Sequence, residues 1–60
     1  MWLFEATYIN MDTDTERKLP IEFDGQFFDK EIECYMYAMD RAIGNRKENE
    51  LFSNLQFIAN

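Results

Sequence analysis

The chain has 60 residues, with 12 acidic side chains, 6 basic side chains and no histidine, and its net charge is −6. This charge repels phosphate backbones and anionic lipids, so we expect neither nucleic acid nor a membrane as a direct partner. The single cysteine excludes an internal disulfide, and without histidine it cannot complete a structural zinc site. A chain of this length is expected to form one small domain, residues 1–60, with a modest core.

Two segments of alternating residues open the chain and predict a β-hairpin. In residues 2–10, apolar side chains occupy every second position, at Trp2, Phe4, Ala6 and Tyr8. In residues 18–24 they do so again, at Leu19, Ile21 and Phe23. A period of two is typical of a strand with one buried face. Pro20 cannot donate a hydrogen bond to a neighbouring strand, so we expect the second strand at an edge of the sheet.

The turn between these segments carries carboxylates at alternate positions: Asp12, Asp14 and Glu16. This spacing matches the first ligands of a calcium-binding loop. Such a loop also needs glycine at its sixth position and glutamate at its twelfth, and here those positions hold Arg17 and Phe23. We therefore predict a solvated turn and no metal site.

Helical spacing follows, from Gln26 to Ile43. Its apolar residues recur every three or four positions and form a stripe that we expect to face the sheet: Phe28, Ile32, Tyr35, Met39, Ala42 and Ile43. Asp24 is the expected N-terminal cap, and Gly44 is expected to end the helix. Cys34 lies on the flank of this helix. We interpret it as a small apolar filler, because the adjacent Glu33 disfavours a reactive thiolate.

The last segment, residues 51–59, fits either a helix or a strand. We choose a strand, because a two-stranded hairpin under one helix is too little sheet to be stable. Its alternation then places Leu51, Leu55 and Phe57 on one face, and the other face holds Phe52, Asn54, Gln56 and Ile58. The prediction is an α+β domain of β-β-α-β order, in which one helix covers one face of a three-stranded antiparallel sheet of order 2-1-3.

No pattern in the sequence indicates catalysis or a bound cofactor. The chain has no histidine base and no glycine-rich phosphate loop, and its carboxylates fall at positions expected to be solvated. A domain of this size also leaves little room for a ligand pocket of about 300 Å³ or more. The rings of the first strand could stack nucleobases, but the alternation places them beneath the helix. We therefore predict that the protein is not an enzyme.

Apolar residues also occur on the sheet face that the helix leaves open, where we expect Leu3, Ile9, Phe52 and Ile58. A contiguous apolar patch is typical of an interface. The sequence therefore predicts a small acidic protein-interaction module whose partner is a protein, in the first place a second copy in a homodimer. The contact would be this open face or the edge of the third strand. The unpaired thiol and the lack of a signal-peptide pattern favour the cytoplasm.

An alternative interpretation uses the carboxylates expected along the helix: Asp24, Asp29, Glu33 and Asp40. Ordered negative charge on a rigid element can imitate a phosphate backbone. The chain would then be an inhibitor or nucleic-acid mimic, of the phage or mobile-element type, that docks a basic protein. The small size, the acidic surface and the β-β-α-β pattern are typical of many bacterial and phage proteins.

Overall fold

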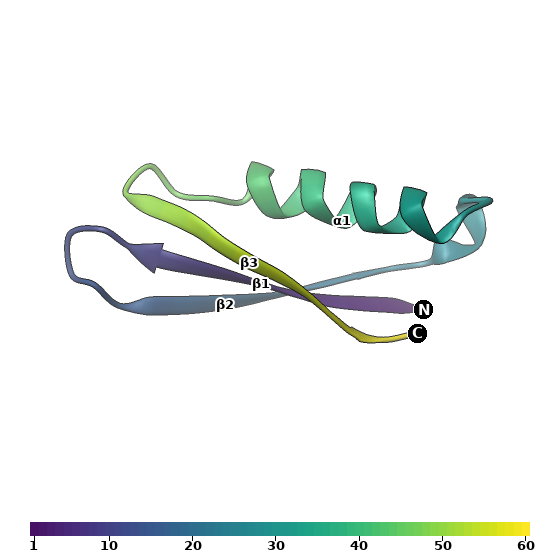
Figure 1. The fold of residues 1–60 in the computed structure, drawn as a ribbon, viewed down its shortest axis with the longest axis horizontal. Helices are drawn as coiled ribbons and strands as arrows, with labels where there is room; N and C mark the ends of the chain where they lie inside the picture. Colours follow the sequence, from purple (N-terminus) through teal and green to yellow (C-terminus); the bar gives the residue numbers. More distant parts are fainter.

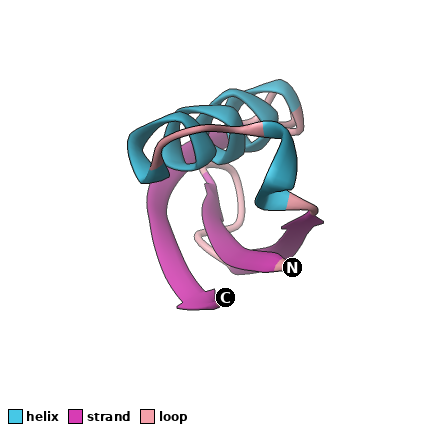
Figure 2. Ribbon diagram, turned by 90° about the vertical axis from the view of Figure 1, so that its right-hand side faces the viewer, coloured by secondary structure: helices cyan, strands magenta, loops and turns pink.

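The computed structural model describes residues 1–60 and has the predicted α+β architecture (Figure 1). Strands β1 (Trp2–Asn10), β2 (Glu16–Phe23) and β3 (Glu50–Ala59) form an antiparallel sheet in the order β2-β1-β3. A short 3-10 helix, η1 (Gly25–Phe27), and the helix α1 (Glu31–Gly44) connect β2 to β3. The helix lies over one face of the curved sheet and leaves the other face open (Figure 2).

The hairpin of β1 and β2 has the predicted orientation, with its rings turned toward the helix. Phe4 pairs with Ile21 and Ala6 with Leu19, so the apolar positions of both strands share one face. Phe4, Ala6 and Tyr8 are at most 1% exposed. Because β1 lies in the middle of the sheet, these side chains form the centre of the core. Pro20 lies on the outer strand β2, as predicted.

The helix begins at Glu31, so the predicted start at Gln26 is wrong. Asp24 caps η1 instead of α1, because its carboxylate accepts a hydrogen bond of 3.1 Å from the backbone N–H of Gln26. The backbone then becomes extended at Phe28, with φ −118° and ψ 140°. In this conformation the Phe28 ring packs against the rings of Phe23 and Tyr37, at centroid distances of 6.0 and 5.3 Å. Aromatic packing thus interrupts a segment whose spacing is helical.

The buried face of α1 consists of small side chains at intervals of four: Cys34, Ala38 and Ala42, each at most 2% exposed. The predicted stripe of larger residues is therefore only partly correct. Ile32 and Ile43 are 59% and 54% exposed, although both were expected in the core. The aromatic rings of the sheet already fill the space beneath the helix, so only small side chains fit between helix and sheet. The larger ones lie along the flanks of α1.

An irregularity at Ser53 shifts the pairing of β3 with β1. Asn54 lies opposite Thr7, but Phe52 lies opposite Tyr8, so Ser53 is an extra residue in β3. An extra residue of this kind inverts the alternation of side chains along a strand. Every side chain before Ser53 therefore lies on the face opposite to the predicted one.

The inverted alternation corrects two predictions about β3. Phe52 was expected on the open face but lies on the face covered by the helix, with its ring 5.9 Å from that of Tyr8. Leu51 was expected in the core but pairs with Ile9 on the open face and is 55% exposed. Leu55, which follows the irregularity, is buried as predicted.

Candidate functional site

The most extensive polar cluster joins the first residues of β2 and β3, and it is centred on Glu50. This carboxylate is only 4% exposed. Arg17 binds this carboxylate in a bidentate manner: its Nε donates to Oε2 at 2.8 Å, and its Nη2 donates to Oε1 at 2.7 Å. The backbone N–H of Lys47 donates a further hydrogen bond of 2.9 Å to Oε1. Each carboxylate oxygen of Glu50 therefore has a partner.

Tyr8 connects this ion pair to the helix. The guanidinium of Arg17 lies over the Tyr8 ring, 4.3 Å from its centroid. The hydroxyl of Tyr8 donates a hydrogen bond of 2.5 Å to the backbone carbonyl of Ala42 in α1. Burial raises the pKa of this hydroxyl. Side chains of all three strands and the backbone of α1 are thus held in one cluster.

The cluster has the chemistry of a structural element. The hydrogen bonds from Arg17 are the main reason that the pKa of Glu50 is lowered from 4.5 to about 2. A general acid or base works best with a pKa near the working pH. A carboxylate that stays charged and bound by a guanidinium is instead suited to fixing the ends of the strands.

Sequence reasoning missed this ion pair, because 33 positions separate its partners. Each partner taken alone resembles a solvated charge beside a turn. The signal is present only in the topology, because the order β2-β1-β3 and the strand register place Arg17 opposite Tyr8 and Glu50 opposite Asn10, two residues further along β1.

The pKa of Glu50 predicts a loss of stability in acid. Because its pKa is lowered on folding, the stabilisation is fully present above pH 4.5 and is lost as the pH falls from 4.5 toward 2. We expect the free energy of unfolding, measured by urea titration at several pH values, to fall through this window. The variant Glu50→Gln should show a weaker fall. Glu48→Gln, at an exposed position two residues away, is the control, and equal pH dependence in the two variants would contradict the prediction.

The four residues predicted as an interface do not form one patch. Leu3 and Ile9 lie toward opposite ends of β1 on the open face, and both are partly buried. Between them lie Glu5 and Thr7, and Glu5 forms an ion pair of 3.6 Å with Lys18 of β2. Phe52, as described above, lies on the other face of the sheet. Ile58 is 46% exposed and adjoins a second irregularity, where the pairing of β3 with β1 shifts between Leu3 and Phe4.

The four carboxylates of the alternative interpretation do not form one helical stripe. Asp24 caps η1, and Asp29 precedes α1. Glu33 accepts a hydrogen bond of 3.2 Å from the backbone N–H of Asp29, so it holds the link to the helix. Asp40 is the other member that lies on α1, where it is exposed.

The carboxylates of the hairpin turn do not gather around a common point. The side chain of Asn10 holds this turn, accepting hydrogen bonds from the backbone N–H groups of Asp12 and Thr13 at 2.9 and 3.1 Å. Asp14 has a positive φ of 60°. No group of three or more acidic or cysteine side chains in the structure is arranged to hold a metal ion.

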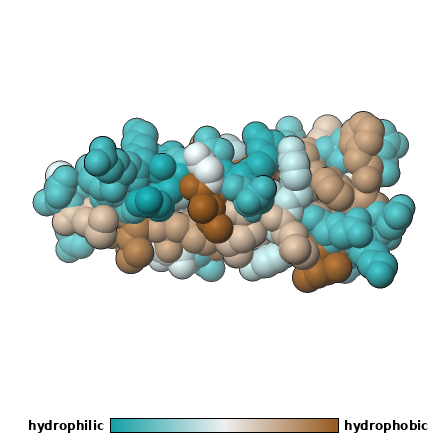
Figure 3. All heavy atoms as spheres, turned by 90° about the horizontal axis from the view of Figure 1, so that it is seen from above, coloured by the Kyte–Doolittle hydropathy of each residue, from teal (hydrophilic) through white to brown (hydrophobic).

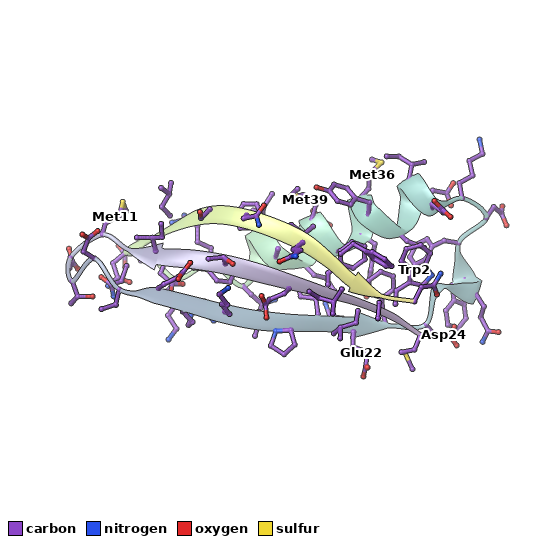
Figure 4. The ribbon with its side chains drawn as sticks, turned by 60° about the horizontal axis from the view of Figure 1, so that its bottom comes forward. Trp2, Met11, Glu22, Asp24, Met36 and Met39 are labelled. Atoms are coloured by element: carbon purple, nitrogen blue, oxygen red, sulfur yellow. The ribbon has the colours of Figure 1, made fainter.

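Apolar side chains are exposed on the helix side of the molecule, where they interrupt its hydrophilic surface (Figure 3). Trp2, Tyr35 and Phe57 line an open groove of about 510 Å³ between α1 and the end of β3. A groove of this volume exceeds the value of about 300 Å³ for which so small a chain was expected to have little room. Figure 4 shows Trp2 beneath the helix, whereas Glu22 points away from it. No local pattern in the sequence indicated this groove, because its lining comes from β1, α1 and β3 together.

The two edges of the sheet differ in chemistry. The outer strand β2 carries four charged residues and one proline: Glu16, Arg17, Lys18, Pro20 and Glu22. In β3, the residues that follow the internally paired Glu50 are LFSNLQFIA, without charge, proline or glycine. One edge of β3 pairs with β1, and its other edge has no neighbouring strand. The molecule thus has one edge with charged residues and one without.

Comparison with protein-family models, with curated proteins and with solved structures gives no match to this chain. Neither of its helices is long enough and apolar enough to cross a membrane. The function must therefore be inferred from the geometry described above.

Proposed function

We propose that the protein is a small non-enzymatic interaction module that self-associates through the free edge of β3. The observation that carries this proposal is the contrast between the two sheet edges. Soluble proteins protect exposed edges with charged residues and proline, because an unprotected edge pairs with another strand. β2 has this protection, and residues 51–59 of β3 lack it. A second copy can add its own β3 there and extend the sheet.

The distribution of charge favours the edge of β3 over the open sheet face as the contact. Two chains of net charge −6 repel one another. Along β3 that repulsion is smallest, because its one charged residue, Glu50, is neutralised internally by Arg17. The open face instead presents the ion pair of Glu5 and Lys18 between its apolar residues. We further propose a cytoplasmic location, because the buried thiol of Cys34 is unpaired, as thiols are in a reducing compartment.

Light scattering after size exclusion tests the proposal. We expect the molar mass of the natural chain to rise toward that of a dimer at high micromolar concentration. The double variant Asn54→Lys and Gln56→Lys should remain monomeric. Both positions are exposed and near the middle of β3, so antiparallel pairing of two such strands about their middle brings the added cations together. Like charges on neighbouring strands destabilise the pairing.

A matched control separates the edge from net charge. Met11→Lys with Gln26→Lys adds the same charge at exposed positions outside the sheet, and this variant should still dimerise. Circular dichroism confirms that both variants fold. A natural chain that is monomeric at high micromolar concentration would overturn the proposal. If both double variants remained dimeric, the edge of β3 would be excluded as the dimer contact.

A further inference from the structure

An aromatic trough lies between the first turn of α1 and the last residues of β3. It is the groove of about 510 Å³ described above. Its floor is formed by Trp2 and Phe4, whose ring planes are 10° apart. The rings of Tyr35 and Phe57 stand steeply to that floor, at 72° and 70° to the plane of Phe4. The trough therefore has an aromatic floor and two aromatic sides.

The walls of the trough are exposed although they are aromatic. Tyr35 is 40% exposed and Phe57 is 48% exposed, whereas Phe4 beneath them is 1% exposed. The floor is closely packed, because a methyl group at Gly25 would collide with the Trp2 indole. The trough thus combines a packed floor with exposed aromatic walls.

The charge of the trough is negative. Glu31, exposed at the start of α1, is the one charged side chain of the lining, which also includes Ile32 and Asn60. Glu31 takes part in neither of the ion pairs of the structure. No basic side chain lines the trough, and the chain as a whole carries a charge of −6. A purely apolar ligand would offer no charge to interact with the carboxylate of Glu31.

We propose that the trough binds an alkylated ammonium group. The faces of aromatic rings are negative and attract cations, and a quaternary ammonium is the cation that aromatic cages recognise. Its methyl groups pack on the rings and leave no N–H donor unpaired. A bare ammonium is strongly hydrated and loses more on entering an apolar trough. The proposal is independent of self-association, since it depends on side chains of one copy.

A comparison of choline with its uncharged isostere, in which a tert-butyl group replaces the trimethylammonium, tests the proposal. Trp2 is the sole tryptophan, so its fluorescence reports binding directly. We expect choline to change the fluorescence saturably and to bind about tenfold more tightly than the isostere, on the scale of a partly desolvated cation–π contact. A short peptide with one trimethyllysine distinguishes a protein side chain from a small molecule as the source of the ammonium.

Matched variants locate the binding. Tyr35→Leu removes one aromatic side and should weaken choline binding about tenfold, whereas Tyr37→Leu, 38% exposed on the same helix but outside the trough, should not. Glu31→Gln, which leaves the core untouched, should weaken binding, and Glu33→Gln should not. Equal affinity for choline and the isostere would show an apolar groove only. That result, the absence of a fluorescence change, or equal effects in each matched pair of variants would overturn the proposal.

Discussion

Phe4→Ala is expected to lower the free energy of unfolding by about 3–5 kcal/mol, the usual loss for a buried phenylalanine. Phe4 is 1% exposed, and four rings surround it at centroid distances of 5.6 to 6.1 Å: Trp2, Phe23, Tyr35 and Phe57. The cavity would lie on the central strand β1 beneath the helix, where these four rings lose their common contact. The core of a domain below about 70 residues rarely supplies more than about 3–5 kcal/mol, so this variant should be largely unfolded near physiological temperature.

Urea titration followed by circular dichroism measures this loss. Phe27→Ala is the control, because Phe27 is 81% exposed and its truncation should change stability by about 0.5 kcal/mol or less. If the two variants lost equal stability, Phe4 would not be the centre of the core. The comparison therefore tests the orientation of β1, on which the arrangement of the fold depends.

The order of elements could be predicted because each strand of the hairpin has a regular period of two. The choice of a strand for residues 51–59 came from a similar physical argument, that two strands and a helix make too small a sheet. Both depend on patterns that extend over many neighbouring residues. Such patterns survive the local irregularities that single residues introduce.

The failures came from side-chain packing and strand pairing, which the spacing of apolar residues does not reveal. Phe28 leaves the helical path to pack on Phe23, and nothing near Gln26 signals this. One extra residue at Ser53 inverts the first part of β3, and only the pairing with β1 reveals it. The predicted interface patch therefore contained Phe52, which lies on the other face.

The two proposed sites differ in how far the sequence alone could predict them. The unprotected edge of β3 could be predicted from composition, because its lack of charge is visible in the sequence. The aromatic trough could not be predicted, because it needs side chains from β1, α1 and β3 together. It also depends on the finding that the helix buries small residues and leaves Tyr35 exposed on its flank.

Ala38→Leu is expected to lower the free energy of unfolding, because α1 lies close to the sheet at this position. Ala38 is 0% exposed and lies between Cys34 and Ala42 on the buried face. A larger side chain there must displace the helix, and overpacking of this kind typically destabilises by about 1–3 kcal/mol. The displacement should also break the hydrogen bond from the hydroxyl of Tyr8 to the carbonyl of Ala42, which adds to the loss.

The same urea titration gives the stability of this variant, and near-ultraviolet circular dichroism reports the packing of the aromatic side chains. Met36→Leu is the control, since Met36 is 63% exposed on the outer side of α1 and its replacement should be close to neutral. An Ala38→Leu variant as stable as the natural chain would mean that space exists between helix and sheet. The larger flank residues could then turn inward, and the exposure of Tyr35 that forms one side of the trough would lose its explanation.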